Sequence, residues 1–158
     1  MDTRWKPHVT VAAVIEQDGR FLLVEEETDD GLRLNNPAGH LDSGESLPHA
    51  CTRETLEETA FAFTPRALVG IYLSRQQRSN GDGITYLRFA FCGELGPHDP
   101  DRALDTGIVR TVWMTPDEIR TSTARHRSPL VLQCTEDYLR GKRHPLDLVR
   151  ADPGAFTE

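Results

Sequence analysis

Six residues at fixed intervals between positions 39 and 58 constrain this chain more than any other feature of its sequence. They are one glycine, one arginine and four glutamates: Gly39, Glu45, Arg53, Glu54, Glu57 and Glu58. An α-helix has about 3.6 residues per turn, so residues three and four apart lie on one face. The spacing therefore predicts a helix through this segment, with the last three glutamates on one narrow face.

Three carboxylates at this spacing repel one another and weaken a helix unless a positive charge lies among them. Oxygen ligands suit a hard divalent cation, Mg²⁺ or alternatively Mn²⁺, and Mg²⁺ usually completes its coordination with water and substrate phosphates. The competing interpretation is a solvated acidic face paired with Arg or Lys. The residues four positions after the three glutamates are Glu58, Phe61 and Ala62, none of them basic. A metal site is therefore the stronger hypothesis.

The apolar residues Leu47, Ala50 and Cys51 fall on the same side of this helix as the acids, one turn earlier. That side should face the protein body, so we expect the carboxylates to be only partly exposed.

The loop before the helix has its own predicted roles. Gly39 lacks a Cβ, so its carbonyl can approach a metal closely. Arg53 can form a bidentate pair with Glu45 that fixes the loop to the helix. We therefore expect Gly39, Glu54, Glu57 and Glu58 to hold the metal, and Arg53 and Glu45 to orient the site.

This segment resembles the signature of the Nudix hydrolases, Gly-x5-Glu-x7-Arg-Glu-U-x-Glu-Glu-x-Gly-U, in which U is a bulky apolar residue. The first glycine and all charged positions match, whereas Thr55 replaces the first U and Ala60 replaces the second glycine. Neither difference removes a metal ligand, so activity should be retained. If that position needs a positive φ angle, Ala60 is poorly suited to it.

Shorter segments resemble the NudJ-type phosphatases of this family. These segments are residues 6–14, 36–41, 86–91 and 127–131, together with Tyr138, Pro145 and Leu146. The resemblance implies a phosphatase that releases inorganic phosphate from nucleoside di- and triphosphates and from hydroxymethylpyrimidine pyrophosphate, a thiamine precursor.

The composition of the chain limits its domain organisation and the kinds of molecule that it could bind. A chain of 158 residues, 37% of them hydrophobic, fits a single domain with a core, and we expect a frayed tail at residues 152–158. The net charge is −7 and the Lys and Arg residues are scattered, which argues against a nucleic-acid-binding surface. The sequence contains no apolar stretch near the ~20 residues of a membrane span and no Cys-x-x-Cys. A cytoplasmic monomer acting on a small phosphorylated molecule is expected.

Alternating apolar segments predict strands at residues 8–15, 20–25, 67–74, 84–94 and 108–114, with a polar loop at 75–83. Thr115-Pro-Asp-Glu118 has the pattern of a capping box and predicts a second helix, and Ser128-Pro129 predicts the start of a third that ends near Gly141. This order fits the α/β class, and the family resemblance implies the Nudix α/β/α sandwich with a mixed central β-sheet.

Further site candidates lie outside the signature. Arg88, Lys6, Arg33 and His40 are candidate phosphate contacts, and Tyr86 is a candidate platform for a base. An additional carboxylate often assists in this family, and Asp105 is preferred here over Glu94 because it lies in a loop.

The expected reaction is metal-assisted attack of water on phosphorus, with Glu54 or Glu58 as the base. The sequence does not choose between these two glutamates. The alternatives are a non-catalytic sensor that binds a phosphorylated ligand and a Nudix pyrophosphatase of another substrate class. Hydrolysis of RNA 5′ ends is disfavoured by the absence of a basic surface.

Overall fold

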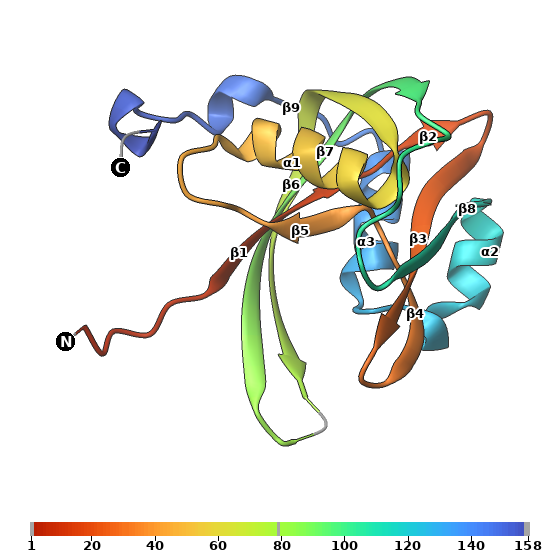
Figure 1. Cartoon of the computed structure of the whole chain (residues 1–158), viewed down its shortest axis with the longest axis horizontal. Coiled ribbons are helices and arrows are strands. Elements are labelled where there is room, and N and C mark those ends of the chain that lie inside the picture. Colours follow the sequence, from red (N-terminus) through yellow and green to blue (C-terminus); the bar gives the residue numbers. More distant parts are fainter. Residues whose placement is uncertain (1, 79, 157–158) are drawn as a thin grey trace.

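The computed structural model describes residues 2–78 and 80–156 (Figure 1). The long strands form two sheets, and three α-helices pack on them. The strands are β1 (His8–Ala13), β2 (Glu16–Gln17), β3 (Arg20–Thr28), β4 (Gly31–Asn35), β5 (Ala38–His40), β6 (Phe61–Gln77), β7 (Gly83–His98), β8 (Ile108–Met114) and β9 (His144–Pro145). The helices are α1 (Leu47–Thr59), α2 (Pro116–Thr121) and α3 (Leu130–Leu139), with short 3₁₀ turns at Thr123–Arg125, Leu146–Leu148 and Pro153–Phe156.

The larger sheet has the strand order β5-β1-β7-β6-β9 and is mixed. Strand β1 runs parallel to β7 and antiparallel to β5, while β6 and β7 form a long antiparallel hairpin that projects from the body (Figure 1). The smaller sheet places β3 between β4 and β8, with β2 pairing with the start of β3. The predicted mixed sheet is therefore confirmed.

Alternation along β1 divides the core into two layers, because successive strand residues face opposite sides. Ala12 and Val14 pack with residues of α2 and α3, including Ile119 and Val131. On the other face the cluster contains Val11, Ala13, Ile15, Ala50 and Cys51, the last two from α1. Helices thus cover both faces of the strands, which confirms the α/β/α arrangement.

Several boundaries differ from the sequence prediction. The strand expected at 67–74 runs from Phe61 to Gln77, and the strand expected at 84–94 runs from Gly83 to His98. Both ends of the expected 75–83 loop are therefore strand, because Arg75, Gln76 and Gln77 pair with Thr85, Ile84 and Gly83. Hydrogen bonding across a long hairpin outweighs the polar composition from which a loop was predicted.

The second and third helices begin close to where they were expected. Thr115 and Glu118 make both hydrogen bonds of a capping box. Helix α3 begins at Leu130, whose backbone N–H donates to the Ser128 hydroxyl at 3.2 Å. Of the tail expected to fray at 152–158, residues 153–156 form a 3₁₀ turn, and residues 157–158 lie outside the described part of the chain.

Ala60 ends α1 in the left-handed conformation that the family pattern assigns to glycine. Its φ is 62°, and its N–H donates to the Leu56 carbonyl at 2.9 Å. A Cβ at positive φ costs roughly 1–2 kcal/mol, whereas the buried methyl contributes about 0.8 kcal/mol. Ala60→Gly is therefore expected to raise the free energy of unfolding by up to about 1 kcal/mol in urea denaturation. A loss of 1 kcal/mol or more would show that the methyl contact dominates.

Among the residues described, no helix is both long and apolar enough to cross a membrane.

Candidate active site

Helix α1 places the acidic residues beside the β5 strand. It begins after Ser46, whose hydroxyl accepts a hydrogen bond from the His49 N–H at 3.2 Å, and Pro48 occupies its first turn. Ala50 and Cys51 anchor the helix in the core. This packing turns the acids toward β5, so their side chains are only partly exposed, as predicted: 13% for Glu54, 33% for Glu57 and 8% for the whole of Glu58.

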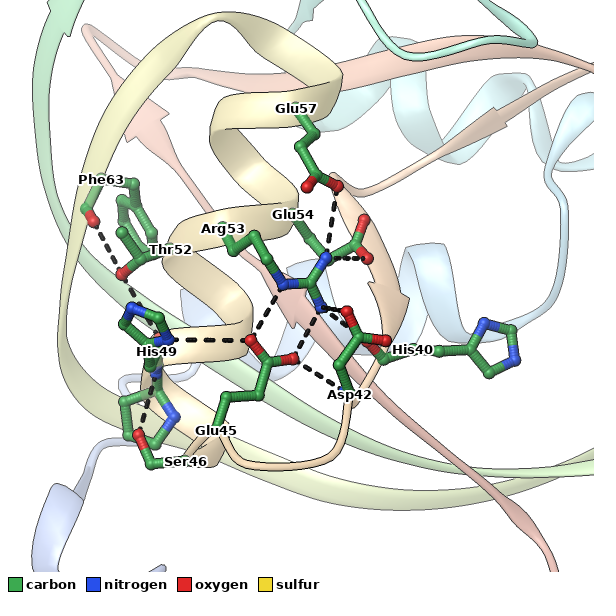
Figure 2. Close-up of polar contacts among 11 residues, drawn as sticks. His40, Asp42, Glu45, Ser46, His49, Thr52, Arg53, Glu54, Glu57 and Phe63 are labelled. Carbon is green, nitrogen blue, oxygen red and sulfur yellow. Dashed lines mark hydrogen bonds and ion pairs between the residues drawn. The ribbon is translucent and has the colours of Figure 1, made fainter. Parts of the chain in front are cut away.

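Arg53 lies at the centre of the polar network in Figure 2. Its Nε and Nη2 donate to the two Glu45 carboxylate oxygens at 2.9 and 2.7 Å, which confirms the predicted bidentate pair. Its Nη2 also donates to the His40 carbonyl at 2.9 Å. Glu45 in turn accepts the Asp42 N–H at 2.8 Å. The arginine therefore joins the loop, β5 and α1, and the ion pair keeps the pKa of Glu45 below its usual value.

The same guanidinium contacts two of the proposed metal ligands. Arg53 Nη1 donates to Glu54 at 2.9 Å and to Glu57 at 3.2 Å. The sequence argument considered only residues that follow each acid, whereas Arg53 lies one residue before Glu54 and four before Glu57. The acidic face is thus partly paired with a basic side chain.

The carboxyl groups of Glu54 and Glu58 have raised pKa values at their positions in the fold. Burial raises the pKa of Glu54 to about 7 and that of Glu58 to about 8. The Arg53 guanidinium opposes the rise for Glu54. For Glu58 the rise is opposed by the Ala38 N–H, which donates to Glu58 Oε1 at 2.9 Å. Neighbouring acids, including Asp105, add to both shifts. At neutral pH, a cation placed among these groups would offset the cost of their charges.

Gly39 provides the close approach that the sequence predicted. A Cβ at this position would overlap the Glu54 carboxyl group. Since non-bonded atoms cannot overlap, no other residue fits here without displacing Glu54. Backbone carbonyl and carboxylate oxygens can therefore meet at this point.

Glu54 and Glu58 line a cavity of about 290 Å³, whereas Glu57 lies outside its lining. Gly39 and Asp105 line the same cavity. The Asp105 N–H donates to the Glu57 carbonyl at 2.9 Å, which holds the loop against α1. Glu94, the other candidate acid, does not line this cavity and instead pairs with Arg66 at 3.0 Å on the surface.

Three of the proposed substrate contacts, His40, Tyr86 and Arg88, line the same cavity. The His40 ring points away from Arg53 (Figure 2) and packs near Tyr86, with ring centroids 6.3 Å apart. Lys6 does not line the cavity and pairs with Asp2, because the N-terminal arm leads away from the sheet. Arg33 lines a neighbouring hollow rather than this one, because it lies on the outer part of β4.

Other polar residues of the cavity were not identified from the sequence. They are Thr10, Glu26, Asn35, Gln76, Arg127 and Ser128. They come from separate strands and from the start of α3, so no local spacing connects them. Glu26 gave the clearest signal, as one of three consecutive acids in a segment that was only partly assigned to a strand.

The donor set was compared with the needs of a divalent cation. Among residues 2–78 and 80–156, no group of three or more His, Cys, Asp or Glu side chains is close enough to hold a metal. Glu54 and Glu57 instead face Arg53 (Figure 2), and Glu58 accepts a backbone N–H. The glycine cradle and the two buried, ionisation-resistant carboxyls nevertheless fit a hard cation, with Gly39, Glu54, Glu57 and Glu58 as the residues that could hold it.

Fold and site together define a Nudix enzyme. Residues 6–134 match the NUDIX domain family, and the chain belongs to that family. It is 37% identical over 154 residues to the phosphatase NudJ of Escherichia coli K12, with 98% of this chain and 97% of NudJ covered. A solved NUDIX hydrolase from Nitrosomonas europaea is 57% identical, with a TM-score of 0.88 and coverage of 94% and 99% of the two chains. The protein is thus a hydrolase of the pyrophosphohydrolase and phosphatase class.

A more distant structure shares only the fold. The NUDIX domain of Shewanella oneidensis NrtR, solved with ADP ribose, is 16% identical, with a TM-score of 0.65 and coverage of 89% of this chain and 93% of that one. This likeness shows the fold alone, so the substrate of this chain must be argued from its own residues.

Proposed function

We propose that this protein is a Mg²⁺-dependent phosphatase that releases orthophosphate from nucleoside di- and triphosphates and from hydroxymethylpyrimidine pyrophosphate. The observation that carries the proposal is the intact acidic face of α1 against the Gly39 cradle, opening into a cavity with two arginines, Arg88 and Arg127. The identity to NudJ over almost the full chain supports the phosphatase branch.

Each residue of the site has a role in this reaction. Gly39, Glu54, Glu57 and Glu58 would hold Mg²⁺, or Mn²⁺ in its place. When bound, the ion would neutralise phosphate oxygens and lower the pKa of water. Arg53 and Glu45 would hold the loop against the helix, and Asp105 would assist as a further acid.

Water supplies the oxygen that forms the new bond to phosphorus, and the bond from phosphorus to the bridging oxygen breaks. Glu54 or Glu58 would accept the water proton, since both line the cavity. The leaving group, whichever side of the broken bond it comes from, keeps the bridging oxygen. All charged residues of the family signature are present, which favours the enzyme over a non-catalytic sensor.

A substrate panel tests the proposal. With Mg²⁺, the protein is expected to release orthophosphate from GDP and from hydroxymethylpyrimidine pyrophosphate, and to act slowly on ADP-ribose and dinucleoside polyphosphates. Phosphate assays and chromatography of the organic product provide the measurement. Preferential cleavage of ADP-ribose to AMP would assign the enzyme to another substrate class, and binding without turnover of any compound would support the sensor.

A further inference from the structure

Arg88 is a buried cation whose partners are all neutral. Arg88 belongs to β7 and lines the cavity, and the residue is 6% exposed. Nη1 donates to Asn36 Oδ1 at 2.9 Å and lies 3.9 Å from Cys134 Sγ, and Nη2 donates to Asn35 Oδ1 at 3.1 Å. Burial of a charge beside amides alone is unfavourable, because a carbonyl dipole does not neutralise it.

No carboxylate of the described chain forms an ion pair with Arg88. The other arginine of the cavity differs in this respect. Arg127 pairs with Glu26 at 2.8 Å, and Glu26 also accepts Asn35 Nδ2 at 3.4 Å. Glu26, a carboxylate of the same cavity, is therefore already paired, and Arg88 has no ion-pair partner among the described residues.

The two asparagines hold this guanidinium in one orientation. Asn35 and Asn36 are both buried, and both present oxygen atoms to it. An arginine has five N–H donors, so donors remain beyond those that bind the asparagines and Cys134. A fixed, planar fork of this kind suits bidentate recognition of phosphate oxygens.

The register of the larger sheet separates the backbone of Arg88 in β7 from β5, the strand that lies beside the α1 carboxylates. Thr10 of β1 lies opposite His40 of β5 and also opposite Arg88 of β7, so the three residues form one row across adjacent strands. Two strand spacings amount to about 10 Å. Gly39 is at the β5 end of this row, beside α1, and the Arg88 backbone is at the other end, from which its side chain reaches Asn35 and Asn36.

We propose that Arg88, held by Asn35 and Asn36, binds the phosphate that stays with the organic group, while the phosphate to be released lies at the α1 carboxylates. This inference rests on the proposed function and deepens it, because it names two phosphate positions in one cavity. The substrate class is then an organic diphosphate or triphosphate, and the organic monophosphate or diphosphate left after hydrolysis is a ligand of Arg88.

The variant Asn36→Asp tests this assignment with almost no change in side-chain shape. It places a carboxylate against Arg88 and so supplies the missing negative charge from within the protein. Binding of GMP and of guanosine is measured by calorimetry in EDTA, where no divalent ion is present and no turnover occurs. Wild-type protein is expected to bind GMP at least about 10-fold more tightly than guanosine, and N36D is expected to lose most of this preference.

Two further variants complete the design. Arg88→Met should reduce GMP affinity like N36D, and it replaces N36D if that variant does not fold by circular dichroism. Arg66→Met removes an arginine that lies on the surface and should leave GMP affinity unchanged. With GDP and Mg²⁺, N36D should raise KM more than it lowers kcat, because the contact holds ground and transition states alike.

The inference is overturned if folded N36D or R88M binds GMP as wild type does, if guanosine binds as tightly as GMP, or if wild type binds no GMP in EDTA. Because this binding needs neither metal nor hydrolysis, its failure is distinct from failure of the proposed phosphatase activity. A protein that hydrolyses none of the panel can still bind GMP through Arg88.

Discussion

Glu57→Gln is expected to lower turnover of GDP by about 100-fold or more while leaving the fold intact. The change removes one charge from the proposed metal ligands, and loss of one preorganised electrostatic contact has effects of this size. Its cost in stability should be small. The side chain is 33% exposed, its pairing with Arg53 at 3.2 Å contributes about 0.5 kcal/mol, and removal relieves repulsion from neighbouring acids.

A matched control is Glu94→Gln, which removes the same charge from a surface acid outside the cavity. Its turnover and midpoint of denaturation should equal those of wild type. Initial rates of orthophosphate release and urea denaturation are measured for all three proteins. Equal rates for E57Q and wild type would indicate that the acidic face is a solvated surface rather than a metal site.

Arg53→Ala is expected to have the largest effect on stability. It leaves the Glu45 carboxylate, 8% exposed, without its bidentate partner, and it removes the cation that contacts Glu54 and Glu57. Loss of one partner from a buried ion pair costs about 3–5 kcal/mol. Turnover should fall by about 100-fold as well, because the loop that carries Gly39 is no longer fixed to α1.

Glu45→Ala should have a smaller effect, because Arg53 keeps its contacts with Glu54, Glu57 and the His40 carbonyl. The double variant should be little worse than R53A alone, since both changes break one pair. Arg53→Lys should recover part of the stability but not the bidentate geometry. Additive losses in kcat and in the free energy of unfolding would show that the two residues act independently.

The sequence predicted the parts of this structure that depend on local spacing. The helix from Leu47 to Thr59, the capping box at Thr115 and the Arg53–Glu45 pair all follow from intervals of three to eight residues. The family pattern has glycine at position 60 and so raised the question of a positive φ, which Ala60 adopts. These features depend on residues that are close together in the sequence, so the spacing of residue types is enough to predict them.

Features that depend on pairing between distant segments could not be predicted in this way. The length of the β6–β7 hairpin is set by cross-strand hydrogen bonds, and the Asn35 and Asn36 contacts with Arg88 join residues more than fifty positions apart. The contacts of Arg53 with Glu54 and Glu57 depend on side-chain rotamers. Lys6 and Arg33 were chosen for their charge alone, and the tertiary fold directs both away from the cavity.

The central claim is that the α1 carboxylates serve a divalent cation in phosphoanhydride hydrolysis. The most direct measurement is orthophosphate release from GDP by wild type and E57Q, first in EDTA and then as Mg²⁺ is added. Wild type should be inactive in EDTA and should gain activity with Mg²⁺ until it saturates, whereas E57Q should need more Mg²⁺ and reach a far lower maximum. Wild-type turnover that is the same with and without Mg²⁺ would contradict the account.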